Sequence, residues 1–284
     1  MSNLKLLFLV LISVFVSSCD DEQDYSELIA LIEDNNEKWL NRDIENYRFS
    51  YFSSPFDCPY ADAGPPIEVN VLNGQVFSVY AMFNENILVD NSSGVLISTL
   101  FGRLLSQIEH IKGTPTFDSQ YGFPTSYEID PSDDECDGSR AGTFDYKSLD
   151  AQDIVQVQYN RTLPDITNEQ QNSWSGLDIS DYTFTYSSTP IDCPVADAFP
   201  PVEITVEDNQ VVSRYVPELG IYLDESDDSY NFTINDIFAD LQHNTRIIQG
   251  EVLFDDNYYF PISYTTNESD EECDGNRVEI SSFM

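Results

Sequence analysis

Two stretches of this chain occur twice, in the same order. The segment Asp57–Glu68 returns as Asp192–Glu203, and both follow the pattern Asp-Cys-Pro-x-Ala-Asp-Ala-x-Pro-Pro-x-Glu. The segment 133–140 returns as 270–277, and both contain Glu-Cys-Asp-Gly-x-Arg. The unit that repeats is about 110 residues long, which is the size of a globular domain and far longer than a solenoid repeat. The sequence therefore predicts two tandem copies of one domain.

The N-terminus has the pattern of an export signal. Lys5 precedes an apolar run from Leu6 to Val16, which is too short to cross about 30 Å of hydrocarbon as a helix. The residues that follow, Val16-Ser17-Ser18-Cys19, resemble a bacterial lipobox, and this resemblance implies cleavage before Cys19 and a diacylglyceryl group on its sulfur. We expect that lipid to hold the mature protein on a membrane. An ordinary signal peptide with an incidental cysteine is the alternative.

The choice between the inner and the outer membrane stays open. Asp20 follows Cys19 directly and resembles the signal that retains lipoproteins in the inner membrane of enteric bacteria. That rule differs between bacterial lineages, so we expect a lipid-anchored, periplasm-facing protein without assigning its membrane.

The charge of the chain excludes some partners. It carries 51 Asp and Glu against 12 Lys and Arg, a formal net charge of -39, while 41% of its residues are hydrophobic. That composition supplies enough apolar material for two cores. A negative field repels nucleic acid and attracts cations and basic proteins. We therefore expect no nucleic-acid partner, and either a basic or cationic partner in the envelope or a surface that only keeps the protein soluble.

The cysteines predict a covalent framework. With Cys19 assigned to lipid, four cysteines remain, and four can pair in three ways. One pair in each copy is the simplest arrangement, and an oxidising periplasm would preserve it. No Cys-x-x-Cys spacing is present and the two histidines are not at equivalent positions, which disfavours zinc. The predicted disulfides are Cys58 with Cys136 and Cys193 with Cys273.

Hydrophobic periodicity predicts the same elements in both copies. Asp24 and Glu27 have the spacing of a capping box before a helix, and the matching helix of the second copy is expected after Pro164. Apolar residues alternate along 47–51 as in a half-buried strand, and Asn73-Gly74 joins two further strands as a hairpin. A second helix around 100–108 and three more strands follow. Each copy is thus expected to run α-β-β-β-α-β-β-β, an antiparallel sheet backed by helices in the α+β class.

This interpretation divides the chain into five parts. They are a signal peptide over 1–18, a tether and helix over 19–37, a first repeat domain over 38–146, a linker and helix over 147–172, and a second repeat domain over 173–284.

The motifs also resemble a family. Trp39 before a Tyr-x-Phe-x-Tyr strand, the Cys-Pro loop, the Val-x-Val-x-Asn-Gly hairpin, Gly-x-Pro and an acidic Asp-Asp-Glu stretch are similar to the bacterial domain of unknown function 6174. The resemblance covers Trp39 to about Tyr146 and Trp174 to the C-terminus. It implies an exported or lipid-anchored protein and assigns no catalytic residue. The second copy departs from the pattern at Asn209 and Tyr259, where the first copy has glycine.

No catalytic motif indicates an enzyme. The chain has no Gly-x-Ser-x-Gly, no His-Glu-x-x-His and no phosphate-binding glycine loop. A hydrolase that uses a pair of carboxylates is an alternative, because 51 acidic residues make such pairs frequent.

One acidic constellation could bind a metal ion. Asp-x-Glu-x-Asp-Gly occurs at 133–138 and 270–275 and resembles the first half of a calcium loop, although Phe144 and Ser281 stand where an EF-hand has its bidentate Glu. The predicted disulfides would bring the Cys-Pro loops to these turns. Arg140 and Arg277 offer another explanation, as counter-ions of solvated acidic turns. The candidate calcium ligands are Asp57, Asp62, Asp133, Glu135, Asp137, Asp192, Asp197, Asp270, Glu272 and Asp274.

The sequence therefore favours a lipid-anchored envelope protein with a noncatalytic binding or structural role. A calcium-binding lipoprotein is the first alternative, and calcium is the only cofactor that the sequence suggests.

Overall fold

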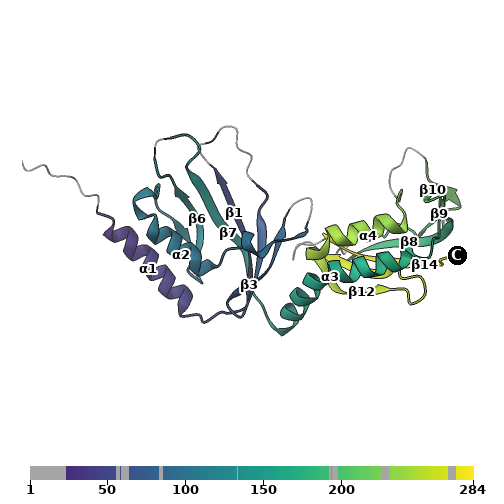
Figure 1. Ribbon diagram of the computed structural model, residues 1–284, viewed down its shortest axis with the longest axis horizontal. Coiled ribbons are helices and arrows are strands. Elements are labelled where there is room, and N and C mark those ends of the chain that lie inside the picture. Colours follow the sequence, from purple (N-terminus) through teal and green to yellow (C-terminus); the bar gives the residue numbers. More distant parts are fainter. Residues whose placement is uncertain are drawn as a thin grey trace, which may run out of the picture.

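The computed structural model describes residues 24–55, 58, 64–82, 86–132, 134–191, 193, 198–224, 230–267 and 273–284. Two similar units follow each other along the chain (Figure 1), here called copy 1 and copy 2. Each holds one seven-stranded antiparallel sheet and two helices. The predicted α+β class and the tandem duplication are confirmed. No helix in the described part of the chain is both long enough and apolar enough to cross a membrane.

Copy 1 begins with a helix and has a second helix after its fourth strand. The strands lie in the order β4-β3-β2-β1-β7-β6-β5. Its elements are α1 (Ser26–Leu40), β1 (Tyr47–Pro55), β2 (Ile67–Leu72), β3 (Gln75–Ala81), β4 (Leu88–Val89), α2 (Ile97–Ser106), β5 (Thr116–Phe117), β6 (Pro124–Ile129) and β7 (Ser139–Ser148).

Copy 2 repeats this topology in the order β11-β10-β9-β8-β14-β13-β12. Its elements are α3 (Ala151–Ser175), β8 (Tyr182–Ile191), β9 (Val202–Glu207), β10 (Gln210–Val216), β11 (Ile221–Tyr222), α4 (Ile234–His243), β12 (Ile248–Phe254), β13 (Pro261–Asn267) and β14 (Gly275–Ser281). The two-residue strands β4 and β11 were not predicted, because two residues are too few to show an alternating pattern.

Aromatic residues form the same cluster in both cores. Trp39 packs edge-on against Tyr47 with ring centroids 5.2 Å apart, and Trp174 packs in the same way against Tyr182 at 5.5 Å. Aromatic edge contacts of this kind add about 0.5–1.5 kcal/mol to the burial of the rings. In copy 1, α1 and α2 lie on one face of the sheet (Figure 1), and Trp39 near the end of α1 belongs to the core between them and the strands.

Hairpin turns form as predicted in both copies. Asn73 and Gly74 have φ values of 52° and 70°, and Asp208 and Asn209 have φ values of 49° and 61°. Two successive residues with positive φ form the turn whose twist matches that of the flanking strands. Copy 2 therefore keeps the turn without its glycine, because Asn and Asp enter the left-handed region more readily than other side chains.

Both predicted disulfides are present. Cys58 bonds Cys136 with Cα atoms 4.4 Å apart, and Cys193 bonds Cys273 at 4.5 Å. Each bond lies within one copy and joins the loop after the first strand to the turn before the last strand.

Two predictions about helix starts are wrong. Tyr25 is the N-cap of α1 and makes no side-chain capping bond, while Asp24 accepts a hydrogen bond from the Ser26 amide at 2.9 Å. The helix of copy 2 does not begin after Pro164 but at Ala151, with Pro164 inside it. A capping box at Asp150 and the contacts of the N-terminal half of α3 stabilise this longer helix against the hydrogen bond that proline removes.

Candidate functional site

The sheet of copy 1 has a second buried face. We call the face opposite its two helices the outer face. Hydrogen-bonded strand register places two rows of polar side chains there. One row crosses β7, β1, β2 and β3 as Lys147, Arg48, Asn70 and Ser78. The neighbouring row crosses β1, β2 and β3 as Ser50, Glu68 and Tyr80.

The N-terminal half of α3 covers part of this outer face. Leu72 and Leu149 of copy 1 pack with Val157 of α3, and Phe77 and Ile154 lie at the edge of the same cluster. This small apolar contact joins the helix that begins copy 2 to the sheet of copy 1. The polar rows beside it are therefore partly enclosed between the two copies.

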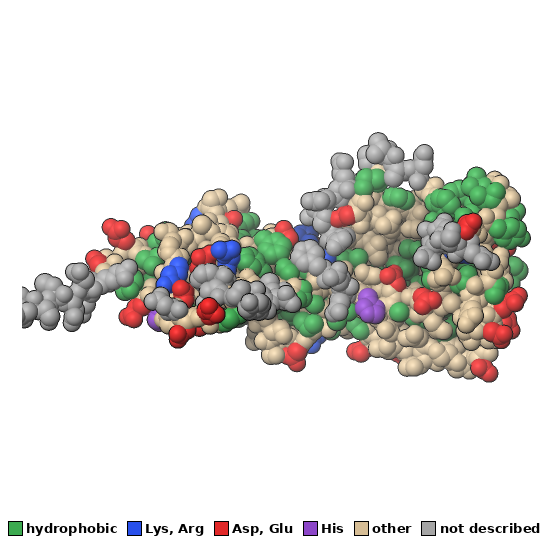
Figure 2. All heavy atoms as spheres, turned by 90° about the horizontal axis from the view of Figure 1, so that it is seen from above, with side chains coloured by type: hydrophobic (Ala, Val, Ile, Leu, Met, Phe, Trp, Pro, Cys, Tyr) green, Lys and Arg blue, Asp and Glu red, His purple; other side chains and the backbone are tan. Residues whose placement is uncertain are grey.

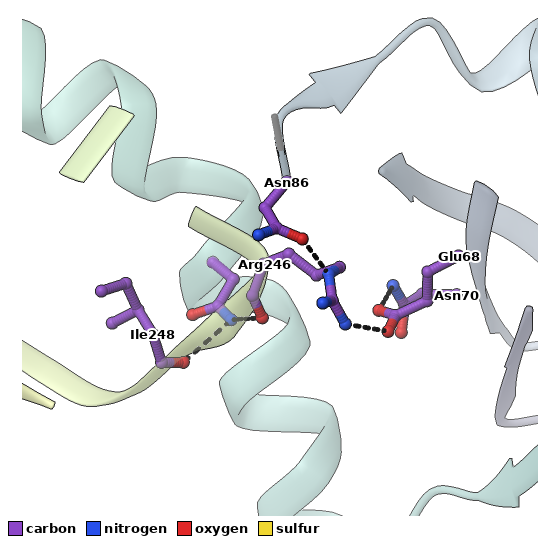
Figure 3. A network of polar contacts seen from close by, with 6 residues as sticks. Glu68, Asn70, Asn86, Arg246 and Ile248 are labelled. Atoms are coloured by element: carbon purple, nitrogen blue, oxygen red, sulfur yellow. Dashed lines mark hydrogen bonds and ion pairs between the residues drawn. The ribbon is translucent and has the colours of Figure 1, made fainter. Parts of the chain in front are cut away.

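One arginine of copy 2 contacts the outer face of copy 1. Arg246, which precedes β12, forms an ion pair with Glu68 at 3.3 Å, and the two side chains are only 7% and 11% exposed. Its Nε also donates to Oδ1 of Asn86 at 2.7 Å, and Glu68 accepts from Asn70 at 3.1 Å. Figure 3 shows the Arg246 guanidinium between Asn86 and Glu68. A buried charge pair of this kind is satisfied only while the two copies stay together.

The helix α3 is fixed to β12 by amide side chains. Asn160 donates to the carbonyls of Arg246 and Ile248 at 3.2 and 3.1 Å. Gln156 accepts from the Gly250 amide at 2.7 Å and donates to the Ile248 carbonyl at 3.1 Å. The same helix therefore packs on copy 1 and is hydrogen-bonded to copy 2, so it sets the position of Arg246.

A polar pocket of about 280 Å³ lies where these groups meet. We call it the inter-copy pocket. Its walls come from the outer face of copy 1, from the first turns of α3 and from strands of copy 2. Its lining includes three cations (Arg48, Lys147, Arg246), two carboxylates (Glu68, Asp153), six amides (Asn70, Gln152, Gln156, Asn160, Gln249, Asn267) and the phenol of Tyr80.

The charges in the pocket are not balanced one to one. Glu68 pairs with Arg246, and Asp153 accepts from Lys147 at 2.8 Å. Burial raises the pKa of Asp153, but the Lys147 hydrogen bond, the Asp150 amide and the charges of Lys147 and Arg48 together hold that pKa below its usual value. Among the described residues Arg48 has no ion pair or side-chain hydrogen bond, so one positive charge is in excess.

Three polar atoms are buried on the outer face. Oδ1 of Asn70 has no hydrogen-bond partner among the described residues, while the hydroxyls of Ser78 and Tyr80 have only each other. Asn70 is 1% exposed and Tyr80 is 2% exposed. Burial raises the pKa of Tyr80, the nearby Ser78 hydroxyl lowers it in part, and the charge of Glu68 raises it further. The Tyr80 phenol therefore stays protonated and can donate a hydrogen bond.

The equivalent positions in the other copy lack the two opposed cations. Thr183 pairs with Met284 across β8 and the C-terminus as Arg48 pairs with Lys147. Thr205 and Ser213 continue that row, where copy 1 has Asn70 and Ser78. Glu203, the counterpart of the buried Glu68, is half-exposed. The duplicated fold therefore does not require the polar pocket, which is specific to the outer face of copy 1.

The sequence-predicted calcium ligands lie mostly outside the described residues. Glu135 and Asp137 are exposed and flank Cys136, and Asp274 follows Cys273. Asp137 accepts a hydrogen bond from Ser132 at 2.7 Å. Within the described ranges no group of three or more His, Cys, Asp and Glu side chains could hold a metal ion. The ligands that lie outside those ranges are Asp57, Asp62, Asp133, Asp192, Asp197, Asp270 and Glu272.

The cations near the acidic turn of copy 1 differ from the expectation. Arg140 is not a counter-ion of the acidic turn but binds Glu128 on the neighbouring strand, with its Nε and Oε1 of Glu128 2.7 Å apart. Arg103 of α2 shares an open hollow of about 650 Å³ with Asp137. Arg103 therefore places a positive charge in the hollow that Asp137 also lines.

Comparison with family models fits this duplicated architecture. A family of unknown function, DUF6174, matches residues 31–145 and again 167–281. The chain belongs to the DUF6174 family. Both DUF6174 copies start inside the first helix of their unit and end in its last strand, so the match follows the structural repeat. No curated protein and no solved structure matches the chain.

Sequence reasoning missed the inter-copy pocket between the DUF6174 copies. The half-buried strand predicted over 47–51 places Arg48 and Ser50 on its solvent side, because they alternate with aromatic residues. The signal that could have found the pocket is the difference between the copies. Arg48 and Lys147 of copy 1 correspond to Thr183 and Met284 in copy 2.

Proposed function

We propose that this protein is an exported, lipid-anchored envelope protein that binds a small ligand in the inter-copy pocket and catalyses no reaction. The observation that carries the binding role is the enclosure of three cations, two carboxylates and six amide side chains in one cavity between two copies of one fold. Ligand sites are concave, and polar groups that converge in them fix the orientation of the ligand. The same face of copy 2 has Thr183 and Met284 where copy 1 has the cations Arg48 and Lys147.

The anchor is supported by the use of the cysteines. Both disulfides together employ four of the five cysteines of the chain. Cys19 is the one that remains, and two serines separate it from the apolar N-terminal run. Lipid on Cys19 would display both copies from a membrane surface, joined to it by the short segment before α1.

Metabolic labelling with a fatty acid tests the anchor. Wild-type protein should incorporate the label and fractionate with membranes. Cys19→Ser should not, because only a thiol can accept the diacylglyceryl group. Equal labelling of Cys19→Ser and wild type would contradict lipid attachment at this residue.

A ligand screen tests the binding role. The chain from residue 19, with Cys19→Ser, retains every described residue and should be incubated with a small-molecule extract of the cell envelope. We expect a bound mass by native mass spectrometry and a higher melting temperature, because a ligand that binds only the folded state stabilises it. The absence of both a bound mass and a shift in melting temperature would contradict a ligand-binding role. A shift with calcium alone, lost in Asp137→Asn with Asp274→Asn, would favour the calcium alternative instead.

A further inference from the structure

Two like charges face each other across neighbouring strands of the inter-copy pocket. Arg48 of β1 and Lys147 of β7 are directly opposite in the strand register, and both line the pocket. Like charges at opposed positions destabilise a sheet. One carboxylate, that of Asp153, accompanies both cations.

The rest of the molecule makes this pair unusual. The chain has only 12 Lys and Arg for a formal charge of -39, and three of those cations line one pocket. On the face drawn in Figure 2, acidic side chains are spread along both copies, while basic ones appear over copy 1 and near the junction. Thr183 and Met284 show that the same strands pair without either charge. The cost of the opposed cations is therefore offset by something other than folding.

An anionic group would relieve the opposed charges. The pocket carries three cations and two carboxylates, which leaves one positive charge for a ligand to neutralise. A carboxylate brings one negative charge. A phosphate monoester brings about 1.5 to 2 at neutral pH, which overcompensates this excess in a protein that is already strongly acidic. The charge count therefore favours a carboxylate.

The rest of the lining favours hydroxyl groups. Six amide side chains line the pocket, and an amide side chain can both donate and accept hydrogen bonds. An apolar ligand would cover these amides without replacing their hydrogen bonds to water, at a cost of about 1–3 kcal/mol for each group left unsatisfied.

The size of the cavity limits the ligand. At about 280 Å³ it lies just below the range for small-molecule sites, which is about 300–1,000 Å³. A single sugar ring fits this volume better than an oligosaccharide or a peptide.

We propose that the inter-copy pocket binds a small hydroxylated carboxylate of the sugar-acid class. Arg48 and Lys147 bind the carboxylate, and the amide side chains of the lining bind hydroxyl groups. This inference rests on the proposed binding function and names its ligand class.

Isothermal titration calorimetry with four probes tests the ligand class. D-glucuronate carries both a carboxylate and hydroxyl groups, D-glucose has the hydroxyl groups alone, acetate has the charge alone, and inorganic phosphate has a different anion. D-glucuronate should bind at least about tenfold more tightly than each of the others, since a tenfold ratio corresponds to only about 1.4 kcal/mol. Equal binding of glucuronate and glucose would overturn the role of the cations, and tighter binding of phosphate would overturn the carboxylate.

The variant Arg48→Thr tests the site itself. It introduces the residue that copy 2 has at the equivalent position and leaves the Lys147–Asp153 pair in place. We expect about tenfold weaker glucuronate binding or more, and a melting temperature without ligand that is unchanged or higher, because repulsion from Lys147 is removed. A purely structural role for Arg48 would instead lower the melting temperature and leave affinity unchanged.

A matched control separates the pocket from the charge of the whole chain. Arg277→Thr removes one exposed cation from β14, which does not line the pocket. It should bind glucuronate as the wild type does. Equal loss of affinity in both variants would overturn the site. If no sugar acid binds at millimolar concentration but the envelope extract still yields a bound mass, the ligand class is wrong while the binding function stands.

Discussion

Asp153 illustrates how one residue serves both the fold and the pocket. Its Oδ2 accepts from the Asp150 amide at 3.1 Å and completes the capping box of α3, while its Oδ1 accepts from Lys147 at 2.8 Å. The carboxylate therefore stabilises the start of the helix that joins the copies and also neutralises one of the two opposed cations. A single substitution should affect both.

We predict that Asp153→Asn lowers the free energy of unfolding by about 1–2 kcal/mol at neutral pH, the cost of a lost cap and a half-buried charge pair. The pKa of Asp153 is lower in the folded state than in the unfolded chain. The carboxylate therefore makes its full contribution to the free energy of unfolding above the unfolded-state pKa, and that contribution is lost as pH falls through the folded-state pKa. The difference between wild type and variant should therefore shrink below about pH 4.

Urea unfolding at several pH values measures that difference. Asp165→Asn is the control, because Asp165 is exposed on the same helix and its removal changes the net charge by the same amount. A destabilisation by Asp153→Asn that stays constant down to strongly acidic pH, or that Asp165→Asn reproduces, would contradict the assigned role of the carboxylate.

At the scale of elements, the two copies have different residues at the same position of the loop before their sixth strand. Gly122 has a φ of 87°, and a Cβ there would lie 2.6 Å from the Asn35 carbonyl oxygen of α1. Its counterpart Tyr259 keeps a positive φ of 68° with a full side chain. Copy 1 therefore needs glycine for space against its helix as well as for backbone conformation, whereas copy 2 accepts the strain.

Gly122→Ala should destabilise copy 1 more than the conformation alone explains. A non-glycine residue in the left-handed region costs about 1–3 kcal/mol, and displacement of α1 adds to this. Gly113→Ala is the matched control, because Gly113 has a φ of 69° and nothing within 4 Å of the added Cβ. Thermal unfolding of both variants should show the larger loss for Gly122→Ala. Equal losses would mean that α1 does not pack closely on this loop.

Much of each element was predictable from sequence because it depends on local pattern. Alternating aromatic residues gave β1 and β8, and Asn73-Gly74 gave the hairpin whose residues both have positive φ. The repeated cysteines gave the disulfide pairing, since one pair per copy is the simplest way to close a duplicated domain. These features need only neighbours in sequence or comparison of the copies.

The remaining features depend on contacts between distant segments. Pro164 suggested a helix start, yet α3 begins at Ala151 because its first turns pack on copy 1 and bond to β12. Arg246 looks like any surface cation in sequence, and only the meeting of two copies places it on Glu68. The inter-copy pocket could not be predicted from alternation, which assigns the outer face of a sheet to solvent.

At the scale of the whole molecule, the junction decides whether the copies behave as one body. The apolar part of the contact is small, with Leu72, Leu149 and Val157 at its centre. Arg161 adds a cation over the Phe77 ring at 4.9 Å. The buried Arg246–Glu68 pair lies at the centre of the polar contacts, together with Asn86. We infer that this pair determines how strongly the unfolding of one copy is linked to that of the other.

Arg246→Met should uncouple the copies. It leaves Glu68 buried without its cation, which typically costs about 3–5 kcal/mol, and separation of the copies would return that carboxylate to water. Each copy has one tryptophan, Trp39 or Trp174, so fluorescence of Trp174→Phe and Trp39→Phe backgrounds reports the two copies separately. The two urea transitions should lie further apart in Arg246→Met than in the parent proteins.

The double variant Arg246→Met with Glu68→Gln provides the control for the buried charge. Removing both charges leaves no unpaired carboxylate, so it should cost less than Arg246→Met alone, although the packing of the methionine is the same. The ion pair would not be what links the copies if the single and double variants showed equal transitions, or if Arg246→Met left both tryptophan signals unchanged. A smaller separation in the double variant would show that the unpaired Glu68 carboxylate, and not the packing of the methionine, uncouples the copies in Arg246→Met.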